Sequence, residues 1–137
     1  MTLDVKDKKA LSDIRMRKAL EFLEDARANL KETRIRTSLN RSYYAALNAV
    51  RSLLILEGVN PETHDGAVTM LSLRFIKPGI LPVEIVKNFK ILLSRRTDVD
   101  YGDFDTQEIS DAEDSLKIAE KMVEEIDRLR KKLMADL

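Results

Sequence analysis

The chain has 137 residues, of which 44% are hydrophobic and 35% charged, and its 24 basic side chains balance 24 acidic ones. This length supports one domain, residues 1–137, with enough apolar residues for a core. The absence of cysteine excludes disulfides, thiolate metal sites and a cysteine nucleophile, and the single histidine, His64, excludes a metal site built from several histidines. No apolar run approaches the ~20 residues of a membrane span, and the N-terminus lacks a secretory signal, so we expect a cytoplasmic protein without a membrane partner.

The balanced total conceals a charge asymmetry along the chain. Residues 31–97 carry 11 basic and 5 acidic side chains, whereas residues 98–127 carry 2 basic and 12 acidic ones. Two interpretations remain open: helices that complement one another within the fold, or a basic face that attracts phosphate. Self-complementary helices are the commoner arrangement.

Apolar residues recur at three- and four-residue steps through the first half of the chain, which predicts two helices. The first is expected over about residues 8–32. The second begins near Ile35 and ends at Gly58, a suitable C-cap, with Pro61 shortly after it. The residues expected to face the core are Leu11, Ile14, Phe22, Leu23, Ala26 and Leu30 in the first helix, and Ile35, Leu39, Tyr43, Ala46, Val50 and Leu53 in the second.

Two further helices are expected in the region that follows. Thr63 can cap a short helix that runs to about Lys77, where Pro78-Gly79 breaks it. Pro82 suits the first turn of the next helix, which frays near residues 98–102. The residues of this helix expected to face inward are Val83, Val86, Phe89, Ile91, Leu92 and Leu93.

The last helix is predicted by the most regular pattern. Asp105-Thr106-Gln107-Glu108 has the form of a capping box, with Asp in place of the usual Ser or Thr. Heptad-like spacing of the apolar residues then supports packing in a bundle, and no stretch alternates long enough for a strand. The expected fold class is therefore all-α, with four main helices and one short one. The apolar stripe of the last helix consists of Ile109, Ala112, Leu116, Ala119, Val123, Ile126, Leu133 and Leu137, with Arg130 interrupting it.

Several enzyme classes lack their motif in this chain. Di-iron bundles need paired Glu-x-x-His motifs, and nucleotide-binding loops need clustered glycines. Here the glycines are scattered at the ends of the predicted helices, and no Gly-x-Ser-x-Gly is present. We therefore expect no metal and no cofactor.

Two local clusters could carry chemistry. The first is the stretch from Asn40 to Asn48, in which Tyr43 lies on the core stripe with its hydroxyl reaching for a partner. Tyr44 lies about 100° further round the helix and faces another helix or a second copy of the chain. Simple aromatic packing is the commoner role for such residues.

The second cluster is the run Arg95-Arg96-Thr97-Asp98-Val99-Asp100-Tyr101. Two interpretations are equally open. The arginines can pair with Asp98 or Asp100 and complement the helix dipole. Alternatively, they can hold a phosphodiester in a bidentate fork, with the tyrosine hydroxyl donating to it or the ring stacking on a base.

In this order the motifs resemble the HEPN superfamily (higher eukaryotes and prokaryotes nucleotide-binding), over roughly residues 20–133. The resemblance implies an up-and-down four-helix bundle with an extra short helix, and a homodimer with the polar motif near its cleft. It also implies metal-independent ribonuclease activity in many members, and a minimal nucleotidyltransferase partner in toxin–antitoxin pairs. The stretches that carry the resemblance are Tyr43-Tyr44-Ala45-Ala46, Pro61-Glu62-Thr63-His64-Asp65-Gly66, Arg95-Arg96 and Asp100-Tyr101.

The catalytic signature of that family is an Arg followed after four to six residues by a His. Arg96 fits the first position, but Tyr101 follows and no His comes after it. A tyrosine with an ordinary pKa near 10 is a poor base, so His64 is the only candidate substitute. A lone histidine at a helix start more often has no such role. The candidate catalytic residues are Arg95, Arg96, Tyr101 and His64, and the candidate RNA or nucleotide contacts are Arg41, Tyr44, Asn48, Arg51 and Asp100.

Three functional hypotheses therefore remain. The first is an RNA- or nucleotide-binding protein with a degenerate nuclease motif, the toxin-like partner of a nucleotidyltransferase. The second is an active metal-independent endoribonuclease. The third is a dimeric helical adaptor without catalysis. In each case we expect a homodimer that covers spare apolar residues such as Leu47, Leu54 and Leu56.

Overall fold

A computed structural model describes residues 2–103 and 106–137 of the chain. Helices, turns and irregular connections account for all of the chain in those ranges. The all-α prediction, with four main helices and one short one, is confirmed. The helices are α1 (Val5–Lys31), α2 (Ile35–Leu54), α3 (His64–Leu71), α4 (Glu84–Tyr101) and α5 (Ile109–Ala135), with a 3₁₀ turn η1 (Ile55–Glu57) after α2 and a π-helical turn η2 (Ser72–Ile76) after α3.

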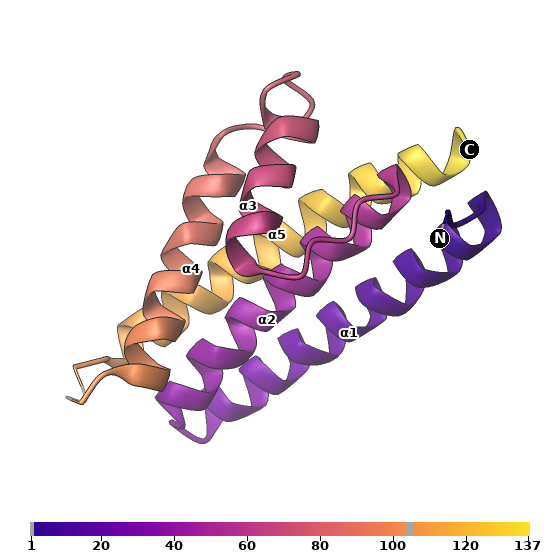
Figure 1. Cartoon of the computed structure of the whole chain (residues 1–137). Helices are drawn as coiled ribbons and strands as arrows, with labels where there is room; N and C mark the ends of the chain where they lie inside the picture. Colours follow the sequence, from indigo (N-terminus) through magenta and orange to yellow (C-terminus); the bar gives the residue numbers. More distant parts are fainter. Residues whose placement is uncertain (1, 104–105) are drawn as a thin grey trace.

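The helix α2 lies at the centre of the bundle. It packs against α1, α4 and α5, and α3 crosses it on the side of α4 (Figure 1). Because neighbours surround it, apolar residues outside its main stripe are also buried. Leu47, Leu54 and Leu56 are only 4%, 0% and 5% exposed, so the expectation that they are spare for a second copy is wrong. A homodimer stays a prediction and needs another surface.

The predicted helix ends in the first two-thirds of the chain are confirmed by their geometry. Gly58 adopts a left-handed φ of 74° after the second helix, and Gly79 one of 81° in the turn before α4. Thr63 is extended, and its hydroxyl accepts a 2.9 Å hydrogen bond from the N–H of Gly66. This N-cap makes His64 the first residue of α3. Pro82 lies just before α4, where its carbonyl accepts from the N–H of Ile85.

The start of α5 differs from the prediction. The helix begins at Ile109, and Glu108 occupies the N-cap position that we expected at Asp105. The side chain of Asp111 accepts a 2.9 Å hydrogen bond from the backbone N–H of Glu108. The capping box therefore lies three residues later than predicted, and Glu108 and Asp111 form it in place of Asp105 and Glu108. Asp105 itself lies outside the described residues.

Some residues at the margins of the predicted stripes face solvent. Ile14, Val83 and Ile91 are 44%, 47% and 40% exposed, although we expected them to face the core. Ile91 illustrates the reason. The buried face of α4 contains Phe89 and Leu92, which are three residues apart, and Ile91 lies between them in sequence and therefore on another face of the helix. Two members of the predicted last stripe also face solvent: Ile109, the first residue of α5, is 44% exposed, and Leu137, which lies beyond the end of α5, is 51% exposed.

The residue that interrupts the α5 stripe is itself buried. Arg130 is 6% exposed, and its Nη1 lies 2.7 Å from Oδ1 of Asp13 on α1. Its Nε donates to Asp127 on its own helix at 3.0 Å. A buried charge is tolerated here because carboxylates compensate it, and the pair ties the end of α5 to the start of α1. Across the described ranges, each helix is too short or too polar to cross a membrane.

Candidate functional site

Tyr43 is the centre of the candidate site. Its ring, supplied by the middle of α2, is fully buried and stacks on Phe89 of α4, with 5.8 Å between ring centroids and 11° between planes. Tyr44 meets it edge-on at 5.1 Å. The sequence prediction of a buried ring whose hydroxyl seeks a partner is confirmed, and that partner is His64.

His64 lies against α2 and contacts Tyr43, although it is 21 residues further along the chain than Tyr43. The Tyr43 hydroxyl is hydrogen-bonded to Nδ1 of His64, and the ring centroids are 5.3 Å apart. The cap at Thr63 fixes where α3 starts and thereby where this imidazole lies. Within the described residues Nε2 makes no hydrogen bond, so it is the nitrogen left to act on a ligand.

The protonation states of this pair follow from their surroundings. Burial, followed by the charges of Arg96 and Arg51, lowers the pKa of His64 below its usual 6.5. Burial is also the main cause that raises the pKa of Tyr43. At neutral pH the site therefore holds a neutral imidazole and a protonated phenol.

Arg96 of α4 lies among all three tyrosines of the chain. Its Cζ is 5.5 Å from the ring centroids of Tyr44 and Tyr101 and 5.7 Å from that of Tyr43. Its Nε lies 2.7 Å from Oδ2 of Asp100, an ion pair in which the N–H is poorly aligned for a hydrogen bond. Burial alone would lower the pKa of Arg96, but the electrostatic effects of Tyr44, Asp100 and Tyr101 are larger in sum, so the pKa is raised. Arg96 therefore stays charged, and in the described chain its Nη1 and Nη2 donate to no acceptor, which leaves them open to an anion.

Arg95, which we expected beside Arg96 in the site, points elsewhere. Its Nη1 donates to Asp114 at 2.8 Å and to Ser115 at 3.0 Å, both on α5. Neighbouring residues on a helix lie about 100° apart, so only one of the two arginines can face α2. The structure brings together His64, Arg96, Asp100 and Tyr101, and leaves Arg95 out.

Four residues of α2 predicted to contact RNA or nucleotide share one side of the helix. Arg41, Tyr44, Asn48 and Arg51 follow one another at steps of three, four and three, over a length of about 15 Å. Arg51 donates to the carbonyl of Pro61 at 3.2 Å, and its Nε is buried with no partner among the described residues. In the part of the chain that the structure describes, neither Arg41 nor Arg51 has an acidic partner.

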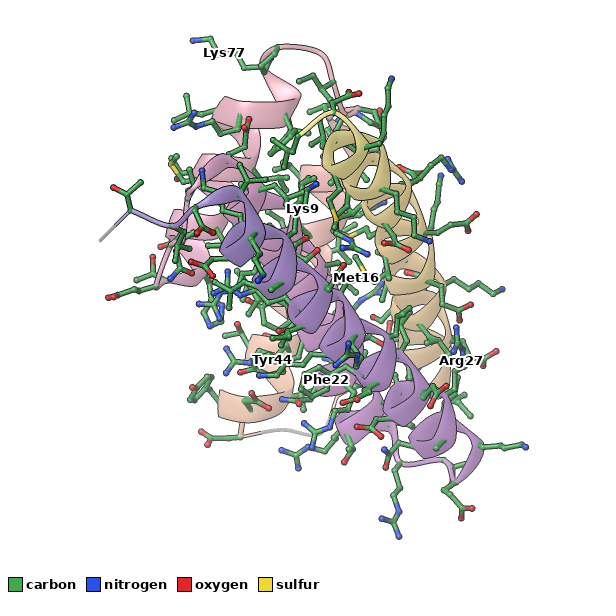
Figure 2. All side chains as sticks on the ribbon, turned by 90° about the vertical axis from the view of Figure 1, so that its right-hand side faces the viewer. Lys9, Met16, Phe22, Arg27, Tyr44 and Lys77 are labelled. Atoms are coloured by element: carbon green, nitrogen blue, oxygen red, sulfur yellow. The ribbon has the colours of Figure 1, made fainter. Side chains whose placement is uncertain are left out.

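Two residues of α1 complete this side of α2 and were missed as site residues. Phe22, expected only in the core, lies beside Tyr44 (Figure 2). The centroid of its ring is 6.0 Å from that of Tyr44 and 5.7 Å from the Cζ of Arg41. Arg15 donates to the carbonyl of Arg51 at 3.4 Å. The seven-residue spacing of Arg15 and Phe22, which places both on one face of α1, is a signal that could have found them. In the described ranges, acidic and histidine side chains form no group of three that could hold a metal ion.

A family model of the HEPN domain matches residues 12–129. The chain belongs to the HEPN family. A UPF0332 protein of Thermotoga maritima is 30% identical over 129 residues, which cover 89% of this chain and 98% of that protein. A Methanocaldococcus jannaschii protein named "Putative toxin MJ0605" is 28% identical over 135 residues, 92% of this chain and 99% of its own length.

A solved structure supports the same fold for this HEPN chain. The crystal structure of TT1696 from Thermus thermophilus superposes with a TM-score of 0.73 and covers 85% of this chain and 96% of its own. The sequences are 18% identical, so the likeness concerns the fold alone. The match of the family model over residues 12–129 confirms the family expected from the short motifs.

Proposed function

We propose that this HEPN chain is a toxin-like protein that binds RNA at the site formed by Arg96 and His64. One observation carries the proposal: a charged arginine with free Nη groups and a neutral imidazole with a free Nε2 both pack on the ring of Tyr43. Related proteins that carry the name toxin support it.

The chemistry of the site suits a phosphodiester. An arginine fork gives two parallel hydrogen bonds to phosphate oxygens, and the neighbouring Tyr101, 72% exposed, offers a hydroxyl and a ring at the rim. Asp100 holds Arg96 in place through Nε and does not occupy the Nη groups. A phosphate can therefore bind without breaking the ion pair.

Arg96 and Arg95 provide a matched pair of variants for testing RNA binding. The probe is a 2′-O-methyl oligouridine in EDTA, which cannot be cleaved through its 2′ oxygen, and the readout is fluorescence anisotropy. We expect Arg96→Gln to weaken binding about 10- to 100-fold, the usual cost of a lost charged hydrogen bond. Arg95→Gln should bind like the native protein, because Arg95 pairs with α5. Equal losses in both variants, or no binding by the native protein, would reject the proposal.

A second function, metal-independent cleavage of the bound RNA, is favoured by the state of His64. In the tautomer whose Nδ1–H donates to the Tyr43 oxygen, the neutral imidazole can take the proton of a ribose 2′-hydroxyl at Nε2. The 2′ oxygen then attacks phosphorus, the bond to the 5′ oxygen breaks, and that oxygen takes a proton from solvent. The products are a 2′,3′-cyclic phosphate and a 5′-hydroxyl, and Arg96 stabilises the charge that develops on the phosphate.

Cleavage is tested with ordinary RNA in EDTA and with His64→Gln. We expect the native protein to release cyclic-phosphate ends, and His64→Gln to lose cleavage while it still binds the 2′-O-methyl probe. Cleavage by His64→Gln at the native rate would assign the reaction to other groups and leave only the binding function.

The expected partner, a minimal nucleotidyltransferase, belongs to the same proposal. A toxin-like role predicts that expression of this chain slows growth and that Arg96→Gln relieves the effect, whereas Arg95→Gln does not. Co-expression with a nucleotidyltransferase encoded beside it should restore growth and yield a complex that co-purifies.

A further inference from the structure

A hollow of about 350 Å³ opens between α1 and α2. The rings of Phe22 and Tyr44 line it, and Lys18, Glu21, Asp25 and Asn48 surround them. Figure 2 shows Phe22 and Tyr44 next to each other beside α1. The hollow is therefore an aromatic surface with a polar rim, which is the usual composition of a small-ligand pocket.

Two arginines lie against the rings that line this hollow. Cζ of Arg96 is 5.5 Å from the ring centroid of Tyr44, and Cζ of Arg41 is 5.7 Å from that of Phe22. A ligand with a flat ring on these aromatics would thus bring attached anionic groups to either arginine. A nucleotide within an RNA strand has this form, since the ribose that bears its base is linked to a phosphate on each side.

The polar groups at the rim mostly accept hydrogen bonds. Nδ2 of Asn48 donates to the carbonyl of Tyr44, so its Oδ1 remains an acceptor. The carboxylates of Glu21 and Asp25 form no ion pair within the described residues, and Lys18 is the only donor with a charge. Such a rim favours a base edge with several N–H donors, and guanine, with N1–H, an amino group and the acceptor O6, fits it better than uracil.

We propose that this hollow is a base-binding subsite that takes one guanine of a single-stranded RNA, stacked on Phe22 and Tyr44, beside the phosphate at Arg96. The inference rests on the proposed RNA binding and adds the base that the site selects.

Stacking is tested with a 2′-O-methyl oligouridine that carries one 2-aminopurine, whose fluorescence falls when the base stacks. We expect the native protein to quench it, and Phe22→Leu, which keeps an apolar side chain, to lose the quench and weaken binding at least about fivefold. Leu20→Ala, an exposed apolar change on the same helix, is the matched control and should behave like the native protein.

Base preference is tested with oligouridine in which one position is guanine. The native protein should bind it more tightly than plain oligouridine, and Asp25→Asn, at an exposed position, should reduce the ratio of the two affinities towards one. RNA binding that depends on Arg96 but shows no quench, or the same quench in Phe22→Leu, would overturn the subsite and leave the proposed function intact. RNA binding that is absent, or indifferent to Arg96→Gln, would overturn both.

Discussion

The hydroxyl of Tyr43 is the only group in the described chain that hydrogen-bonds to the imidazole of His64, which allows a single-atom test. Tyr43→Phe removes it and leaves the stacked ring in place. Because the Nδ1 of a half-buried imidazole then lacks its partner, we expect the free energy of unfolding to fall by about 1 kcal/mol. Urea denaturation measures it. Tyr101→Phe is the control, since that side chain is 72% exposed, and a loss as large there would refute the assignment.

His64 also predicts a pH dependence of stability. Its folded pKa lies below the unfolded value of 6.5, so between the two values the unfolded chain binds more protons. The free energy of unfolding should therefore fall as the pH drops below about 6.5, and stop falling once the folded group titrates as well. The measurement is denaturation between pH 4.5 and 8 for the native protein and His64→Gln, compared as a difference. If the difference in free energy of unfolding between the two proteins does not vary with pH, His64 is not the cause of the pH dependence.

The position of His64 depends on the start of a whole helix. Thr63→Ala removes the hydroxyl that caps α3 and should cost about 1 kcal/mol of stability. Because His64 is the next residue, the same change should also reduce RNA cleavage, whereas Thr63→Ser keeps the cap and should preserve both. If Thr63→Ala lowers stability but leaves cleavage unchanged, the cap does not position the imidazole.

Helix periodicity explains why the elements could be predicted and why some contacts could not. The stripe of α2 from Leu39 to Leu53 is visible in the spacing alone, and all its members are buried. The burial of Leu47 depends on α2 having neighbours all round, which spacing does not reveal. The pairing of Tyr43 with His64 depends on the path of the chain between α2 and α3. Likewise, the pairing of Arg130 with Asp13 depends on which helices meet.

Across the whole molecule, the arginines of the proposed RNA site predict how RNA binding responds to salt. Three phosphate contacts, from Arg41, Arg51 and Arg96, give a slope of log K against log salt near −2 for a single strand, so affinity should fall roughly 20-fold from 50 to 200 mM salt. Arg51→Gln should make the slope shallower by about 0.7. Arg74→Gln, exposed on η2, is the control and should leave it unchanged. A salt-independent affinity would exclude binding led by phosphate.

The gathering of Tyr43, Tyr44 and Tyr101 around Arg96 gives the molecule a built-in optical reporter. The chain has three tyrosines and no tryptophan, so all of its tyrosine emission comes from rings whose centroids lie within 5.7 Å of the Cζ of Arg96. Whatever displaces or neutralises Arg96 changes the surroundings of every emitting ring at once. Ligands for this site can therefore be screened on the unlabelled, unmodified protein by excitation near 275 nm, with no signal from the rest of the bundle to subtract.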